Sequence, residues 1–366
     1  MAKLLMMPGL GAAEGLARGK KNALFNTLEE FHKYWERIDI VVPRVKNQQV
    51  TNVFGNVFIH CSPFPLFLHP LFFIFKIVKL HRMVGFDLMT VHEFPPFYNG
   101  IAARLLWYIT HIPYIIEVMH IPGHPRAGNL KEWFYKHFMR CFIAFDTKKA
   151  KAVRVMNKHE VPEFLVHAGV PREKIKLIPA IYIDQTIFHP QEVEKKYELI
   201  FVGRLEKNKG TDIFVKAVAL LGVKAIVIGA GPLEEELKSL AQKIGADITF
   251  HGFAKDAHTV AHLMNESRVL VMCSYNEGGP RVVVEAMACG VPVVATRVGI
   301  VSDIVPEEQQ CDWNPTDLSA KVKRLLNELG VYKSARSAGL EAVKPFEKTV
   351  TVSFYAAKLI ELINKS

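Results

Sequence analysis

Short apolar runs alternate with longer amphipathic stretches along the first half of the chain. The runs with the length and character of buried strands are Lys3–Met7, Asp39–Pro43, Val57–Cys61, Asp87–His92, Tyr114–His120 and Val153–Asn157. Helical periodicity runs through Asn22–Glu36 and again near Gly100–Thr110. Strands that alternate with helices of about 10–15 residues are typical of βαβ units, so the pattern predicts a parallel sheet.

A second alternating pattern begins near Tyr197. Its strand-like runs are Glu198–Val202, Lys224–Gly229, Asp247–Gly252, Val269–Ser274 and Val291–Thr296, and its helical stretches are Thr211–Leu221 and Leu233–Ile244. The polar stretch Thr186–Lys196 between the two patterns is typical of a linker. The chain is therefore expected to be an α/β protein with two doubly wound, Rossmann-like domains that face a central ligand-binding cleft.

The same patterns predict where the domains end. Residues 1–185 are expected to form the N-terminal domain, and residues 186–348 the C-terminal domain. Residues 349–366 are expected to form a C-terminal helix, and the N-terminal domain is one surface on which this helix can pack.

Composition and charge narrow the classes of protein that this chain can be. Half of its 366 residues are apolar and 22% are charged, which is globular rather than disordered or fibrous. Its five cysteines include no CxxC pair, which argues against a disulfide scaffold or structural zinc site and favours a cytoplasmic location. Residues 1–190 hold 24 Lys and Arg against 14 Asp and Glu, so the whole net charge of +10 lies in this half. The asymmetry predicts two domains with different partners.

The densest candidate chemistry lies in residues 274–296. Gly278-Gly279 form a tight loop, Pro280 suits the first position of a helix, and Gly290 suits its end. The free N–H groups and positive dipole at such a helix start make an anion site. Glu277 and Glu285 flank this site and can accept hydrogen bonds from hydroxyl groups on either side of a bound diphosphate.

At these residues the sequence resembles the retaining glycosyltransferases of family 4 (glycosyl transferases group 1), which have the GT-B fold. The landmarks are Glu277 and Glu285 eight positions apart, followed by Ala286-Met-Ala-Cys-Gly-Val-Pro-Val-Val-Ala295. Residues 199–210 resemble the family's strand ending in Gly-Arg with a following Lys-Gly, and residues 117–120 resemble its strand ending in an active-site histidine. Gly279-Pro280 stand where the family has Phe-Gly, a departure that removes one backbone donor.

The resemblance implies roles for individual residues in transfer from a nucleotide sugar. Cationic groups at Arg204 and Lys209, with the helix start at Pro280–Val282, would stabilise charge on the leaving diphosphate. Glu285 would hold the ribose hydroxyls, Glu277 a donor-sugar hydroxyl, and His120 would approach the sugar from the other domain. The expected catalytic residues are His120, Arg204, Lys209 and Glu277, and the expected donor-binding residues are Gly11, Gly203, Phe253, Gly278, Gly279, Arg281, Val282 and Glu285.

The resemblance further implies a hexosyltransferase-like reaction with retention that needs no cofactor and no metal ion. Residues 64–82 are very apolar with cations at their C-terminal end, and too short to span a bilayer. With the basic half of the chain, they favour a lipid-linked or membrane-surface glycan as acceptor and peripheral contact with anionic lipid on the cytoplasmic face.

Several alternatives stay open at this stage. Residues 64–82 can equally form an ordinary core helix, His120 can be structural, and Arg204 and Lys209 can be a solvated pair. The acceptor can be a soluble sugar. The chain can also be a catalytically silent GT-B binding module, and the departure at Gly279-Pro280 favours this alternative. A nucleic-acid partner is not expected, because no aromatic–basic recognition motif is present.

Overall fold

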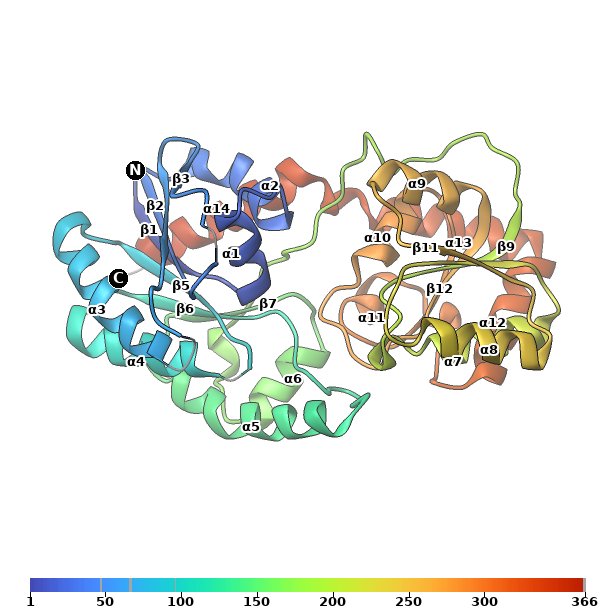
Figure 1. The fold of residues 1–366 in the computed structure, drawn as a ribbon, viewed down its shortest axis with the longest axis horizontal. Helices are drawn as coiled ribbons and strands as arrows, with labels where there is room; N and C mark the ends of the chain where they lie inside the picture. Colours follow the sequence, from blue (N-terminus) through green and yellow to red (C-terminus); the bar gives the residue numbers. More distant parts are fainter. Residues whose placement is uncertain (47, 66–67, 96, 365–366) are drawn as a thin grey trace.

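Two parallel sheets, each covered by helices on both faces, organise the chain (Figure 1). The computed structural model describes residues 1–46, 48–65, 68–95 and 97–364. The predicted α/β class with two parallel sheets is confirmed.

The first sheet has the strand order β3-β4-β2-β1-β5-β6-β7-β8. Every pairing in it is parallel except that of β3 with β4. The chain order reverses between β1 and β5, which makes the carboxyl ends of these two strands the switch point of the sheet. The strands are β1 (Lys3–Met7), β2 (Arg37–Val42), β3 (Asn52–Val53), β4 (Val57–Cys61), β5 (Leu88–His92), β6 (Tyr114–Val118), β7 (Ala152–Val155) and β8 (Ile175–Leu177).

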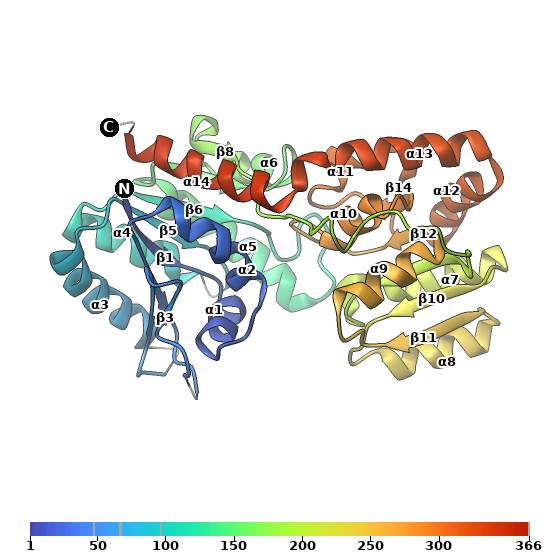
Figure 2. The same ribbon diagram turned by 90° about the horizontal axis from the view of Figure 1, so that it is seen from above.

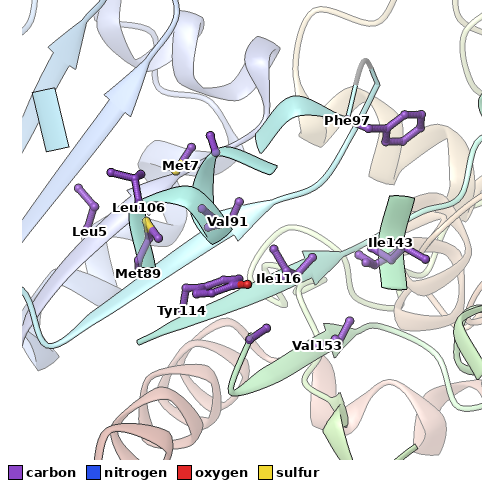
Figure 3. Close-up of a cluster of buried hydrophobic side chains, with 14 of the residues drawn as sticks. Leu5, Met7, Met89, Val91, Phe97, Leu106, Tyr114, Ile116, Ile143 and Val153 are labelled. Atoms are coloured by element: carbon purple, nitrogen blue, oxygen red, sulfur yellow. The ribbon is translucent and has the colours of Figure 1, made fainter. Parts of the chain in front are cut away.

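Helices on both sides explain why most residues of the central strands are apolar and buried. Successive residues of β1 point to opposite faces, so Leu4 joins one core cluster and Leu5 the other. Figure 3 shows the second of these clusters, in which Val91 and Tyr114 pack beneath Leu106. The helices are α1 (Leu10–Ala17), α2 (Ala23–Phe31), α3 (His69–Val84), α4 (Tyr98–Thr110), α5 (Leu130–Thr147) and α6 (Glu160–His167).

The second sheet has the order β11-β10-β9-β12-β13-β14, and its switch point lies between β9 and β12. All of its pairings are parallel. The strands are β9 (Tyr197–Val202), β10 (Ala225–Ile228), β11 (Ile248–Gly252), β12 (Ser267–Met272), β13 (Val293–Thr296) and β14 (Gln310–Cys311). The helices are α7 (Thr211–Leu221), α8 (Glu234–Ile244), α9 (Ala257–Asn265), α10 (Arg281–Ala288), α11 (Val301–Ile304), α12 (Pro315–Asn327) and α13 (Leu329–Ala342).

The last helix, α14 (Lys348–Asn364), leaves the second sheet and packs on the first (Figure 2). Val352, Ala356 and Leu359 are buried in the same cluster as residues of α1, α2 and β1. The rings of Phe31 and Tyr355 stack with centroids 4.8 Å apart. Residues 365–366 of the predicted C-terminal helix lie outside the described residues.

Three local features of the first domain bear on the expectations from the sequence. The predicted helix Asn22–Glu36 is α2 followed by a 3-10 turn at His32–Tyr34. Residues 69–84 of the apolar segment form α3, which buries Phe73 and Ile77, while residues 66–67 lie outside the described residues. The sequence pattern does not predict α5, because exposed aromatic residues hide the narrow buried stripe of Met139 and Ile143.

Candidate active site

The two domains meet where the chain leaves β6 and where it leaves β12. His120 Nε2 and Asn276 Oδ1 lie 2.9 Å apart, and this hydrogen bond joins the domains. Gly278 lies directly against the backbone beside His120, since a Cβ atom built on it would be 1.9 Å from the carbonyl oxygen of Met119. Burial lowers the pKa of His120, with the Asn276 contact acting in the opposite direction, so the imidazole is neutral at pH 7.

Asn276 extends this contact to the start of α5. Its side-chain amide donates to the carbonyl of Arg126 at 3.0 Å and to Glu132 Oε2 at 2.9 Å. Glu132 in turn accepts from the backbone N–H of Gly128 at 2.8 Å, and the Asn129 side chain caps α5. A connected set of hydrogen bonds therefore fixes the loop after β6 to the loop after β12.

Lys209 and Glu277 form an ion pair at the switch point of the second sheet. Lys209 ends the 3-10 turn that follows β9, and Glu277 belongs to the loop that follows β12. Ser274 Oγ donates to the same carboxylate oxygen of Glu277 at 3.2 Å. Gly210 has φ +61°, and a Cβ atom there would lie 2.3 Å from the Cys273 carbonyl oxygen. The two loops are thus packed together, which holds Lys209 near the expected leaving group.

The helix that starts beside this pair is α10. Pro280 is its N-cap residue with ψ 100°, and Arg281 is the first helical residue. The helix therefore begins one residue later than the sequence predicts. No side chain of the described residues caps this start, and the Val283 N–H donates to the Pro280 carbonyl. The N–H groups of Arg281 and Val282 therefore remain available to an anion. Arg281 Nη2 lies 3.6 Å from Glu285 Oε1, and burial raises the pKa of the Glu285 carboxyl.

A cavity of about 520 Å³ lies at the switch point of the first sheet. Gly9, Gly11 and His92 line one side of it, and Tyr355 of α14 lines another. Its remaining lining residues are Met6, Pro8, Ala12, Ala23, Leu24, Thr27, Phe94, Glu117, Arg154, Pro179, Ala180, Tyr182, Thr351 and Val352. Of the expected site residues, Gly11 alone is among these described lining residues.

Three polar side chains form the floor of this cavity. Arg154 Nη1 donates to Glu117 Oε1 at 2.6 Å, and Tyr355 donates to the same oxygen at 2.7 Å. The Arg154 guanidinium lies over the Tyr355 ring, 3.6 Å from its centroid. Because all three are buried and paired, the rest of the cavity offers a mainly apolar wall.

Comparison with known proteins connects this geometry to a family. Residues 183–341, which carry Lys209, Glu277 and Glu285, match the family model described as "Glycosyl transferases group 1". Residues 183–341 therefore belong to the group 1 glycosyl transferases.

Curated relatives carry glycosyltransferase names. The D-inositol 3-phosphate glycosyltransferase of Arthrobacter sp. (strain FB24) is 34% identical over 163 residues, which are 39% of this chain and 38% of that protein. An uncharacterized glycosyltransferase of Methanocaldococcus jannaschii is 27% identical over 307 residues, 81% of this chain and 82% of that protein. A Campylobacter jejuni N-acetyl-D-galactosaminyltransferase, whose name specifies a glycan on PP-undecaprenol, is 27% identical over 49% of this chain and 52% of its own length. The chain thus spans about half or less of two of these relatives.

Solved structures share the arrangement of both domains. Sucrose-phosphate synthase from Thermosynechococcus elongatus superposes with a TM-score of 0.79 over 100% of each chain, at 17% identity. Anabaena HepE in complex with UDP and glucose gives a TM-score of 0.74 over 99% of this chain and 100% of that one, at 18% identity. At these identities the likeness establishes the GT-B fold of the chain and nothing further.

Two of the expected site residues, Arg204 and Phe253, have largely exposed side chains. The Arg204 side chain is 70% exposed and pairs with Glu206 at 2.9 Å. Phe253, just after β11, is 75% exposed. Gly203 lies in the loop after β9 and donates its N–H to the Ile228 carbonyl. Gly279 lies in the loop after β12 and abuts Ile181, and Val282 is half-buried in α10.

Sequence reasoning missed the residues that connect the domains of this glycosyl transferase. Asn276 lies inside the recognised motif, one residue before Glu277, and an amide beside a catalytic carboxylate is the signal that could have singled it out. Glu132 carries no such signal, because it is 144 positions from Asn276 and only the fold brings them together. Glu160 likewise accepts from the N–H of Gly299 across the domains, and burial raises its pKa to about 8.

Proposed function

We propose that this glycosyl transferase moves a sugar from a nucleotide-diphosphate sugar to a lipid-linked or membrane-surface glycan, with retention and without a metal ion. The observation that carries the proposal is the Lys209–Glu277 pair beside the uncapped start of α10, facing His120 across the domains. An ammonium group and free N–H groups held in place before reaction stabilise charge that develops on a leaving phosphate.

Each group in this arrangement has a distinct role in the proposed transfer. Lys209 and the N-terminal N–H groups of α10 bind the diphosphate, and Glu277 accepts a hydrogen bond from a donor-sugar hydroxyl. Neutral His120, oriented by Asn276, approaches the sugar from the N-terminal domain. Glu285 accepts hydrogen bonds from the ribose hydroxyls, and the leaving phosphate takes the proton of the acceptor hydroxyl.

A lipid-linked acceptor is favoured over a soluble sugar by two observations. The cavity near Gly9 and Gly11 has mainly apolar walls, and Phe75 and Met83 of α3 are 75% and 73% exposed. Lys79 and Arg82 lie beside these two residues along a groove between α3 and α4. Exposed apolar groups next to cations suit an anionic bilayer surface, so we place the enzyme peripherally on the cytoplasmic face of a membrane. No helix within the described residues has the length and apolar character to cross a membrane.

The donor is tested by calorimetry with a panel of UDP-, GDP- and ADP-sugars. We expect one tight donor and, for Glu285→Ala, a loss of affinity of about 10- to 100-fold, because a charged hydrogen-bond acceptor is removed. Glu285→Gln separates loss of charge from loss of packing in α10, and Glu235→Ala, an exposed change on α8, is the control. Equal donor affinity in Glu285→Ala and wild type would contradict the assigned role.

The rival proposal is a silent GT-B binding module, and it is tested by comparing donor binding with nucleotide release in the wild-type protein. Pro280 lacks the N–H that another residue would offer at the start of α10, which is the observation that favours the rival. Binding of the donor without release of nucleotide, even with crude membrane extract as a source of acceptor, would support the silent module and contradict an enzyme.

Metal independence gives a further expected result. Among the described residues, no group of three or more His, Cys, Asp and Glu side chains is placed to hold a metal ion. We expect transfer rates to stay within about twofold after treatment with EDTA, because Lys209 and the α10 N–H groups supply the positive charge. A rate that falls with EDTA and returns with Mg²⁺ or Mn²⁺ would contradict the proposal.

A further inference from the structure

One helix of the N-terminal domain carries an unusual number of exposed aromatic residues. In α5, Leu130, Trp133, Phe134, Phe138, Phe142 and Phe145 are between 37% and 70% exposed, and we call these six residues the α5 surface. The neighbouring α4 adds Leu105 and Ile109, at 44% and 56%. Contiguous exposed apolar groups of this size mark interaction sites on soluble proteins.

A cation-rich pocket opens beside the α5 surface. It has a volume of about 340 Å³ and lies between α5 and α6, which lie next to each other in Figure 1. Its described lining residues are His124, Lys136, His137, Arg140, Glu163, Phe164 and His167, so a single carboxylate faces two permanent cations. Lys136 and Arg140 are four residues apart on one face of α5, and neither forms an ion pair within the described residues.

The chemistry of this pocket fits a phosphate group. An arginine fork and a lysine ammonium are the side chains that proteins use most for phosphate oxygens. Burial, with the Lys136 charge as a further cause, lowers the pKa of His124 to about 4, so this imidazole is a neutral hydrogen-bonding group at pH 7. Lys136 and Arg140 outnumber the single Glu163 carboxylate in the pocket, and a bound phosphate would supply the further negative charge.

The surroundings of the pocket indicate where that phosphate comes from. His137 lines the pocket, and the centroid of the Trp133 ring lies 4.1 Å from that of the His137 ring. Indole groups are favoured at the boundary between lipid headgroups and acyl chains. The aromatic rings of the α5 surface suit a bilayer interface as well as stacked nucleic-acid bases. The aliphatic side chains of Leu130, Leu105 and Ile109 suit only the bilayer, which favours a lipid as the source.

We propose that α5 binds an anionic phospholipid, whose phosphate occupies the pocket lined by Lys136 and Arg140 while the α5 surface enters the membrane interface. This inference rests on the proposed function, since it names the surface that brings the enzyme to its acceptor. The link to the active site is direct: Glu132, one turn before Lys136 on α5, binds Asn276, which binds His120. A lipid held by α5 is therefore held next to the domain contact.

The test is sedimentation of the full chain with phosphatidylcholine vesicles that contain or lack phosphatidic acid, without nucleotide sugar. We expect binding to the anionic vesicles, and a loss of about 10- to 30-fold in apparent affinity for Lys136→Ala/Arg140→Ala. Phe134→Ser/Phe138→Ser should remove the part of the binding that survives high salt, because that part comes from apolar insertion. The control is Lys243→Ala/Lys323→Ala, which removes two exposed lysines from α8 and α12.

Four results would overturn the inference. Equal vesicle binding by the wild type and both α5 variants would exclude this surface. Calorimetric binding of inorganic pyrophosphate that needs Lys136 and Arg140, without vesicle binding, would assign the pocket to a free phosphate compound. Binding of a single-stranded oligonucleotide in place of vesicles would assign it to nucleic acid. A protein that binds donor but no vesicles contradicts this inference and the peripheral placement of the enzyme, but not the proposed sugar transfer. A protein that binds vesicles but no donor contradicts the proposed sugar transfer alone.

Discussion

Lys209→Ala should lower the rate of sugar transfer by about 10²- to 10³-fold, the usual effect of removing one preorganised group that stabilises transition-state charge. Lys209 is held against Glu277 at the switch point of the second sheet. Arg204→Ala should have a much smaller effect, because this side chain is 70% exposed and paired with Glu206. The measurement is release of nucleotide from the donor chosen by calorimetry, with membrane extract as the acceptor source.

The matched control for Lys209 is its neighbour in the same 3-10 turn. Lys207→Ala removes an exposed lysine two residues away and should leave the rate within about twofold of wild type, as surface substitutions usually do. A larger loss for Arg204→Ala than for Lys209→Ala would reverse the roles that we assign. A His120→Ala variant should lower turnover more than donor binding, because His120 lies across the domain contact from the α10 anion site.

Gly278→Ala should lower transfer by about 10²-fold while leaving each domain folded. The added methyl would meet the Met119 carbonyl oxygen at 1.9 Å, and backbone atoms cannot move aside as a flexible side chain can. The domains must then separate slightly, and an error of about 1 Å in the position of reacting groups costs about this much. Nucleotide release measures the rate, and small-angle scattering should record a larger radius of gyration.

Gly330→Ala is the control for the added methyl group. No heavy atom lies within 4 Å of a Cβ atom at this position, which is in the helix α13. The variant should be as active as wild type and equally or more stable, because alanine favours a helix more than glycine does. Full activity in Gly278→Ala would show that the contact with Met119 is not needed for transfer.

The C-terminal sheet could be predicted closely because its central strands are buried on both faces. Such strands are continuous apolar runs that end where the polar loops begin, as Val291–Thr296 and the observed Val293–Thr296 illustrate. Helix α7 matches at both ends, since Gly210 and Gly222 flank it in the left-handed conformation that few other residues adopt.

Two features of the site could not be predicted because they depend on contacts between distant residues. Arg204 and Lys209 occur in one motif, and only the fold shows that Glu206 binds the first while Glu277 binds the second. Helix α5 escaped prediction because its exposed aromatic residues mask its amphipathic pattern. The residues that it contributes, Glu132 above all, therefore became visible only in the structure.

The position of α14 means that the N-terminal domain is discontinuous in the chain. Its apolar cluster needs Val352, Tyr355, Ala356 and Leu359, which the ribosome makes only after the whole C-terminal domain. Until then part of the helical cover on one face of the first sheet is missing, and so is Tyr355, which contacts both Arg154 and Glu117. The domain that starts first during synthesis is consequently completed last. A fragment ending at residue 185 would lack this helix, whereas one with residues 348–364 joined to its end would restore it.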